Sequence, residues 1–265
     1  MTRELLVALG GRVLFNLRSI GRFTLLLGDV AVWSFVRPFR GFPLRRNELF
    51  KQMRIIGLDS LPIVGLISLI MGMIIALQSA KQAEPFGAEM YIGMLVAYAM
   101  VRELGPLMAA IMLSGRVGAR FAAELGTMKV SEEIDALEVM ALNPVRFLIV
   151  PRVLAIIAML PCLTVLADLI GYFGGMFTAA AIVGVDPVLY YQKTVEFLKM
   201  QDVFTGLVKS LFYAIIVGGI GCYKGIHVSE GAAGVGIATT ESVVMSIFLI
   251  VCTDCIATAF FYFLE

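Results

Sequence analysis

RELGPLMAAIMLSGRVGARFAAELGTMKVSEEIDALEVMALNPVRFLIVPR, residues Arg102–Arg152, is the most informative part of this 265-residue chain. It begins inside an apolar segment with two adjacent charges, Arg102 and Glu103, and continues through a charge-rich part to the next apolar segment. We interpret it as a membrane helix with two intramembrane charges, followed by a cytoplasmic helix suited to binding by another protein.

The composition favours a polytopic, all-α membrane protein. The chain is 60% hydrophobic and 15% charged, with a mean hydropathy of +0.92, whereas a soluble domain is about half apolar and a quarter charged. Several apolar runs reach the roughly 20 residues that a membrane helix needs. The arginine-rich start lacks a small-residue cleavage site, so we expect no removed signal peptide. No basic tract is interleaved with aromatics, so we expect no nucleic-acid partner.

Residues 1–54 are predicted to form an interfacial amphipathic helix and a basic connector. The segment at 23–36 is apolar but too short to span, and Trp33 within it suits the headgroup level. The alternative is a helix packed on the protein's own surface. One helical face of the preceding residues is apolar, with arginines off that face: Leu6, Leu9, Val13, Leu17 and Ile20.

Residues 55–265 are predicted to form a domain of five transmembrane helices. Pro161 suggests a kink or break in the third helix. Lys209, near the outer end of the fourth, is expected to snorkel to the interface. The spans are expected at about 55–78, 90–113, 153–185, 203–223 and 242–264.

The distribution of Lys and Arg predicts the orientation. Ten lie before the first span, five around the loop between the second and third spans, and one in the last loop. The other side carries four, Lys81, Lys193, Lys199 and Lys209. The positive-inside rule therefore predicts a cytoplasmic N-terminus and an external C-terminus.

Intramembrane charges are the candidate functional residues. Each costs about 2.5–3.5 kcal/mol at the bilayer centre, so Arg102 and Glu103 should face protein or a water-filled cavity. Two interpretations remain open, ion pairs between helices and residues that line a substrate cavity. Helical geometry does not require Arg102 and Glu103 to pair with each other. Asp168 and Asp254 also lie within predicted spans, and a polar contact between helices is as good an interpretation of Asp168 as a functional one.

The segment 114–146 is predicted to be a cytoplasmic loop that holds a short amphipathic helix. Ser131 is expected to be its N-cap, with acidic residues in the first turn, and Asn143-Pro144 to end it. Ile134, Leu137 and Met140 or Ala141 should share one face. Such a helix is suited to a groove of a soluble partner; the alternative is a solvated connection.

The cysteines and the histidine of the chain do not indicate a catalytic or metal-binding site, and the sequence has no P-loop motif for nucleotide binding. Cys252 and Cys255 form a C-x-x-C within an apolar segment, where we expect packing rather than redox or metal binding. His227 has no nearby Cys or His. No G-x-x-x-x-G-K-[ST] motif occurs, so the chain lacks that route to ATP hydrolysis. We expect no metal, no cofactor and no catalytic residue in this chain.

The block at 102–152 resembles the signature region of the MlaE/YrbE permease family, and GMIIALQ (72–78) and GVGIATTESVV (234–244) match in the expected order. The resemblance covers nearly the whole chain. It implies a homodimeric, non-enzymatic permease of the bacterial inner membrane, with ATP bound by a separate cytoplasmic ABC ATPase. It also implies a periplasmic MCE-domain ring and, in many systems, a STAS-domain protein.

The cargo implied by the resemblance is phospholipid, moved between the inner and outer membranes to maintain outer-membrane lipid asymmetry. Related systems take sterols or other hydrophobic compounds. Position by position, the resemblance places Arg102 and Glu103 by the substrate cavity, with Ile75, Gln78 and Leu154 as further lining residues. The coupling helix that contacts the ATPase would lie at about 124–142 and include Glu124, Gly126, Met128, Glu132, Glu133 and Leu137.

Two other classes of function remain open. One is an ATP-independent channel or carrier with Asp168 and Asp254 as coupling-ion sites, although no clear inverted repeat is present. The other is a scaffold that anchors an extracytoplasmic ring.

Overall fold

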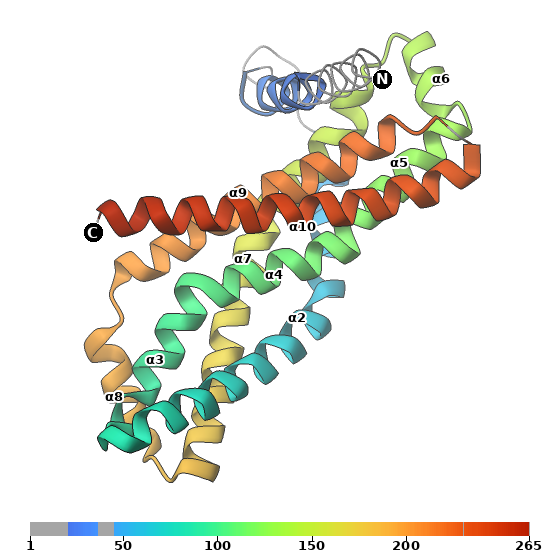
Figure 1. The fold of residues 1–265 in the computed structure, drawn as a ribbon. Helices are drawn as coiled ribbons and strands as arrows, with labels where there is room; N and C mark the ends of the chain where they lie inside the picture. Colours follow the sequence, from blue (N-terminus) through green and yellow to red (C-terminus); the bar gives the residue numbers. More distant parts are fainter. Residues whose placement is uncertain (1–20, 37–44, 230, 265) are drawn as a thin grey trace, which may run out of the picture.

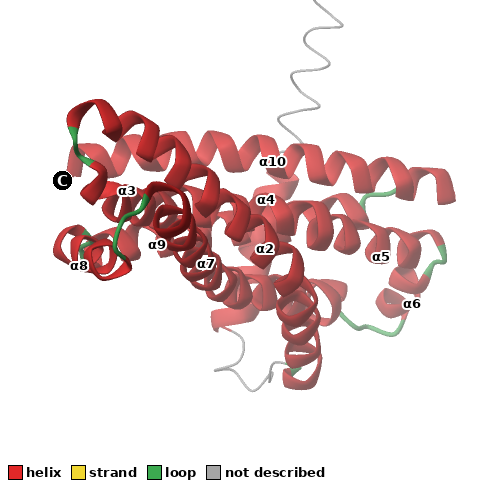
Figure 2. Cartoon of the chain, turned by 90° about the horizontal axis from the view of Figure 1, so that it is seen from below, coloured by secondary structure: helices red, strands yellow, loops and turns green. Residues whose placement is uncertain are grey.

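The computed structural model describes residues 21–36, 45–229 and 231–264. Helices make up the secondary structure of these ranges, without strands, as Figures 1 and 2 show. Within these ranges, five helical runs are long and apolar enough to cross a membrane. The predicted all-α polytopic fold is therefore confirmed.

The five runs are built from the following elements. The first is α2 (Arg46–Ala83), continued by η3 (Glu84–Phe86). The second comprises η4 (Glu89–Tyr91), α3 (Ile92–Ala99), η5 (Met100–Leu104), α4 (Gly105–Leu113), η6 (Ser114–Gly118) and α5 (Ala119–Val130). The third comprises η7 (Val145–Ile149), α7 (Val150–Thr178) and η8 (Ala179–Val183). The fourth is α9 (Met200–Ile226) and the fifth α10 (Gly231–Leu264).

Shorter helices lie at the two ends of the bundle (Figure 1). One end carries α6 (Glu133–Val139) and the helix at 21–36, which includes η1 (Val32–Val36). The other carries α8 (Pro187–Phe197), whose N-cap Asp186 accepts a hydrogen bond from the Val188 amide at 2.9 Å. This end corresponds to the predicted external side.

Several helices are longer than the apolar runs predicted. The second run reaches Val130, so residues 114–130 are helix rather than loop, and α10 begins inside the glycine-rich stretch expected to be a loop at 224–241. The length of an apolar run predicts only the part of a helix that contacts the hydrocarbon core. It does not predict polar residues that extend the helix beyond the core. Of the kink or break predicted at Pro161, the break is wrong, because α7 continues through that residue. Membrane helices tolerate proline where neighbouring helices support the backbone.

The helix at 21–36 packs on the protein itself. Trp33 is 8% exposed, and Leu26 and Val30 join it in the main core. The Phe23 ring meets Tyr223 of α9 edge to face, 5.8 Å between centroids. These contacts favour the alternative of a helix on the protein surface for this part. The predicted apolar face from Leu6 to Ile20 lies outside the described residues.

The closest packing between two spans joins α2 to α7. A Cβ atom on Gly72 would overlap the carbonyl oxygen of Gly171, so the two backbones touch there without side chains between them.

Gly72→Leu should therefore destabilise the bundle by about 1–3 kcal/mol, because the neighbouring atoms are backbone and cannot rotate away. Thermal unfolding in detergent measures the effect. Gly236→Leu is the matched control, since nothing in the described part of the chain lies within 4 Å of a Cβ atom added there. Equal melting temperatures for the two variants would contradict the packing at Gly72.

Candidate functional site

A buried lysine joins two carboxylates between the second, fourth and fifth runs. Lys209 Nζ lies 2.7 Å from Glu103 Oε2 and 3.1 Å from Asp254 Oδ1. It also donates to Thr258 Oγ1 at 2.7 Å, and the Tyr213 hydroxyl donates to Asp254 Oδ1 at 2.6 Å. These five residues form what we call the Lys209 cluster.

The electrostatics of the Lys209 cluster make its members interdependent. The Lys209 side chain is 1% exposed, Asp254 18% and Glu103 35%. A single charge held away from water is costly, whereas a paired and hydrogen-bonded one is tolerated. Two carboxylates face one ammonium, and Glu103 keeps an exposed side. The Lys209 cluster therefore has hydrogen-bonding groups that can exchange partners with a polar headgroup.

Arg102 forms a second ion pair, with Asp202. Its Nη1 lies 3.2 Å from Asp202 Oδ1, with the two side chains 12% and 8% exposed. The same nitrogen donates to the Tyr98 hydroxyl at 2.6 Å. Asp202 Oδ2 accepts from the Lys199 backbone amide at 2.9 Å, which fixes the carboxylate at the start of α9. Arg102 and Glu103 thus have separate partners on α9, as their separation around a helix allows.

The local sequence makes these approaches possible. η5 is π-helical, and the proline that follows it at 106 has no backbone N–H to donate. Gly206 lets α9 come close, because a Cβ atom there would overlap the Val101 carbonyl oxygen. Gly105 makes room in the same way for Asp168, whose Oδ1 is buried without a hydrogen-bond partner among the described residues.

The other predicted lining residues are dispersed. Ile75 is half-buried and packs in the smaller core cluster, which also contains Met100. Gln78 is exposed on α2. Leu154 packs instead in the main core, two residues after Arg152. The structure thus places Ile75 with a residue of η5 and Leu154 in a different cluster.

At the opposite end of the second run, Glu124 links two arginines. Its Oε1 accepts from Arg120 Nε at 2.6 Å and its Oε2 from Arg152 Nη2 at 3.1 Å. Arg152, whose side chain is 10% exposed, also donates to the Leu148 carbonyl at 2.8 Å. Glu124 was predicted to contact an ATPase; in the structure its carboxylate ties α5 to α7 within the chain.

The predicted cap of the coupling helix is wrong. Ser131 follows the end of α5, and its hydroxyl donates to the Thr127 carbonyl at 3.0 Å. The N-cap of α6 is Glu132, with a left-handed φ of 60° and no side-chain cap. Because α5 extends to Val130, Ser131 closes that helix instead of opening the next.

The exposed face of α6 also differs from the prediction. Ile134 is 5% exposed and packs on its own chain, whereas Val139 is 88% and Met140 60% exposed. Asp135 pairs with Lys129 of α5 at 2.6 Å, which fixes α6 against α5.

The remaining predicted coupling residues differ in exposure. Glu132 and Glu133 are exposed, and Leu137 is half-buried. Met128 packs against the main core, and a Cβ atom on Gly126 would lie 3.0 Å from Val228 Cγ2. Thus Gly126 and Met128 contact the chain's own core, while the two glutamates remain available to a partner.

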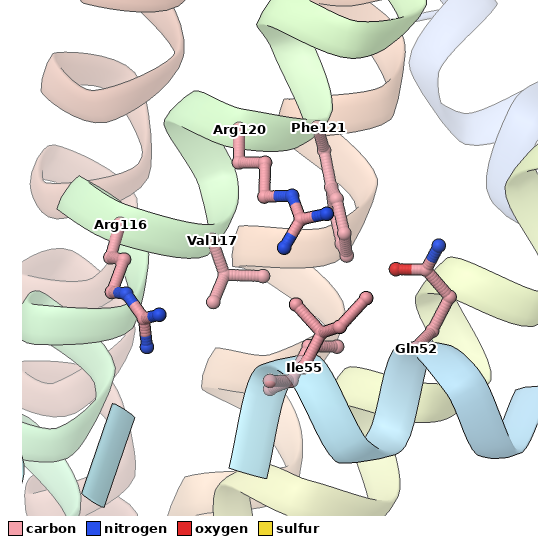
Figure 3. A pocket seen from close by; sticks show the side chains of 7 residues that line it. Gln52, Ile55, Arg116, Val117, Arg120 and Phe121 are labelled. Atoms are coloured by element: carbon pink, nitrogen blue, oxygen red, sulfur yellow. The ribbon is translucent and has the colours of Figure 1, made fainter. Parts of the chain in front are cut away.

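A small cavity lies between α2 and the second run near this end (Figure 3). Its volume is about 20 Å³, enough for about one water molecule. Arg116 beside it lies 3.3 Å from Asp59 and donates to Ser60 at 2.8 Å. The cavity is too small for a lipid headgroup. Its lining residues are Gln52, Ile55, Ile56, Arg116, Val117, Arg120 and Phe121.

Two further groups of predictions concern chemistry. No set of three or more His, Cys, Asp or Glu side chains in the described ranges could hold a metal ion. Cys252 and Cys255 are free thiols.

Outside the spans, burial raises the pKa of Tyr190 in α8, so its phenol stays protonated.

Sequence reasoning missed the centre of the site. Lys209 was expected to snorkel outward, but it is almost completely buried, so that prediction is wrong. Asp202, Tyr213 and Thr258 were not singled out. The available signal was the presence of opposite charges in three different spans, which favours pairing in a membrane interior.

Five spans in the described part of the chain, with an ionic cluster between them, define a polytopic membrane protein. The family described as Permease MlaE matches residues 49–260, and the chain therefore belongs to the MlaE permease family. It is a permease, the membrane subunit of a transporter.

Individual relatives are similar over most of their length. The chain is 38% identical to a "probable ABC transporter permease protein" of Rickettsia felis, over 96% of both chains. It is 34% identical, again over 96% of both, to the "intermembrane phospholipid transport system permease protein MlaE" of Haemophilus influenzae. A Synechocystis "probable ABC transporter permease protein" is 38% identical over 82% of both chains.

Proposed function

We propose that this permease moves phospholipid between the inner and outer membranes of a bacterium, as part of an ABC transporter. The observation that carries the proposal is the Lys209 cluster, which provides charged side chains that form hydrogen bonds between otherwise apolar spans. Acyl chains would contact the apolar walls, and the headgroup would lie near Glu103 and Arg102. The name of the Haemophilus relative supports phospholipid as the cargo.

The remaining parts of the machine are further proposals. A cytoplasmic ATPase would bind ATP and contact α6, an MCE-domain protein would receive lipid on the α8 side, and a STAS-domain protein is a further candidate partner. The chain would lie in the inner membrane with a cytoplasmic N-terminus and a periplasmic C-terminus. A second copy would cover α10, which is exposed along one edge of the bundle (Figure 2) and has only 11% of its most apolar stretch buried.

Gentle affinity purification from native membranes tests these proposals, with mass spectrometry of proteins and lipids. We expect an ATPase, an MCE-domain protein and bound phospholipid to be recovered together. Recovery of the chain without an ATPase would favour an autonomous channel or carrier. Recovery of the complex with sterol instead of phospholipid would overturn the cargo.

Arg102→Ala should reduce lipid transfer roughly 10- to 100-fold, the effect of losing one or more hydrogen bonds from a charged group. Lipid transfer between vesicles by the reconstituted complex measures it. The same preparation should retain its subunits. If the subunits separate instead, Arg102 serves assembly through its Asp202 pair and not the cargo.

Val139→Asp combined with Met140→Asp should reduce co-purification of the ATPase by roughly tenfold or more, because a carboxylate would enter an apolar contact without a partner. The neighbouring exposed residue Glu138 supplies the control variant Glu138→Gln. Unchanged ATPase recovery with both aspartates would place the contact elsewhere.

A further inference from the structure

The Lys209 ammonium uses its three hydrogen-bond donors inside the chain. Its Nζ donates to Glu103 Oε2 at 2.7 Å, to Asp254 Oδ1 at 3.1 Å and to Thr258 Oγ1 at 2.7 Å. A lysine ammonium has three donors and no acceptor, and this side chain is almost completely buried. Lys209 therefore joins the spans to one another, and the phosphate of a cargo lipid could bind it only by displacing one of these bonds.

The part of the Lys209 cluster that a ligand can reach consists of hydrogen-bond acceptors. The Glu103 side chain is 35% exposed, the most accessible of the three charged groups. The Thr258 hydroxyl donates to the same carboxylate, 3.1 Å from Oε1 and 3.4 Å from Oε2. Since a carboxylate has about four lone-pair sites, Glu103 can accept a further hydrogen bond on its exposed side.

The Lys209 cluster also carries an excess of negative charge. Two carboxylates face one ammonium, which leaves one formal negative charge. The neighbouring pair of Arg102 and Asp202 is balanced. Asp168, beside Gly105, adds a carboxyl group rather than a cation. In a membrane interior, where charges are weakly screened, this imbalance favours a ligand that brings a positive charge.

Exposed apolar side chains on the same helices favour a lipid over a soluble amine. Leu95 of α3 and Val251 and Ile256 of α10 are exposed, and both runs are long and apolar enough to cross a membrane. A soluble amine would lose its hydration there, whereas a lipid would keep its acyl chains in apolar surroundings.

We propose that Glu103 makes this permease selective for lipids whose headgroup carries a primary ammonium, the chemistry of phosphatidylethanolamine. The ammonium donates to the exposed side of the Glu103 carboxylate, which Lys209 and Thr258 hold in place. Phosphatidylcholine carries the same charge without N–H donors, and phosphatidylglycerol carries no cation. The inference rests on the proposed transport of phospholipid and adds the headgroup preference of that site.

Competition among these three lipids tests the preference. The complex that contains this chain is purified from native membranes and reconstituted, and the donor vesicles hold equal amounts of the three lipids with identical acyl chains. Mass spectrometry of the acceptor vesicles gives a transfer rate for each lipid. We expect phosphatidylethanolamine to be transferred roughly tenfold faster than phosphatidylglycerol, the effect of one hydrogen bond between charged groups, with phosphatidylcholine between them.

The outcomes separate the selectivity from the transport itself. Transfer of none of the three lipids would contradict the proposed function. Equal rates for all three would leave phospholipid transfer standing and overturn the selectivity. Phosphatidylcholine moving as fast as phosphatidylethanolamine would show that charge alone is recognised, and would overturn a hydrogen bond from the ammonium to Glu103.

Variants assign the preference to a residue. Glu103→Gln keeps an oxygen that can accept from Lys209 but removes the charge, so the preference should fall to roughly twofold or less. Asp254→Asn removes the same formal charge from a less exposed position and should keep more of the preference. Equal losses in the two variants would assign the preference to the net charge of the Lys209 cluster and overturn the role of Glu103. Glu84→Gln, at an exposed acid outside the Lys209 cluster, should leave the preference unchanged.

A second measurement does not depend on transfer. The full chain is purified in detergent, equilibrated with the same lipid mixture and washed, and the lipids that stay bound are counted by mass spectrometry. We expect phosphatidylethanolamine to be enriched over phosphatidylglycerol on the wild-type chain, and the absence of enrichment would overturn the proposal. Thermal unfolding of Glu103→Gln shows whether its fold persists, because Glu103 also binds Lys209. A folded Glu103→Gln variant with wild-type enrichment would overturn the assignment to Glu103.

Discussion

Lys209→Ala should destabilise the protein by about 3–5 kcal/mol and abolish lipid transfer. The substitution leaves Glu103 and Asp254 without their shared cation in a membrane interior, and an unpaired buried charge costs that much. Thermal unfolding of the purified chain in detergent measures the first effect, and lipid transfer between vesicles measures the second.

Removing one carboxylate as well provides the matched test. Lys209→Ala combined with Asp254→Asn should recover part of the lost stability, because one uncompensated charge disappears. Lipid transfer should stay low if the Lys209 cluster binds the headgroup. A single Lys209→Ala variant as stable as wild type would show that water or protonation relieves the two carboxylates.

The second large effect is expected at the other end of the second run. Arg152→Ala removes the hydrogen bonds that join Glu124 to the Leu148 carbonyl through Arg152. It should lower the free energy of unfolding by about 1.5–3 kcal/mol, the usual contribution of hydrogen bonds to charged groups. If this bridge transmits motion from α5 to α7, lipid transfer should fall more than ATP hydrolysis does. Both rates are measured on one reconstituted complex.

Arg120→Ala is the control for this prediction. Arg120 binds the same carboxylate but its side chain is 39% exposed, so its loss should cost less than about 1 kcal/mol. Equal stabilities for the two variants would contradict a special role of the buried bridge. Equal losses of transfer and hydrolysis with Arg152→Ala would make its role structural only.

The sequence allowed the five spans to be predicted because apolar length is a direct requirement of the bilayer. It did not allow the ends of the helices to be predicted. The segment after Leu113 is polar, and yet η6 and α5 continue the helix because α9 and α10 pack against it, as contacts at Gly118 and Gly126 show. The wrong cap at Ser131 follows from the same extension.

The candidate site was predictable only in part. Arg102 and Glu103 were recognisable as charges in an apolar run, but their partners Asp202 and Lys209 are about 100 residues away in the chain. Pairing across such a distance depends on which faces of the helices meet. Close approach at Gly206 determines this, and no local pattern encodes it.

The second run, Glu89–Val130, is a continuous helical rod of 42 residues, about 63 Å long at 1.5 Å per residue. That is roughly twice the hydrocarbon thickness of a bilayer. Glu103 and Glu124 both lie on this continuous helix, and no loop separates them. A displacement at the α6 end would therefore be transmitted along the helix to the middle of the membrane. The two π-helical segments and Pro106 are positions on this run where helices commonly bend.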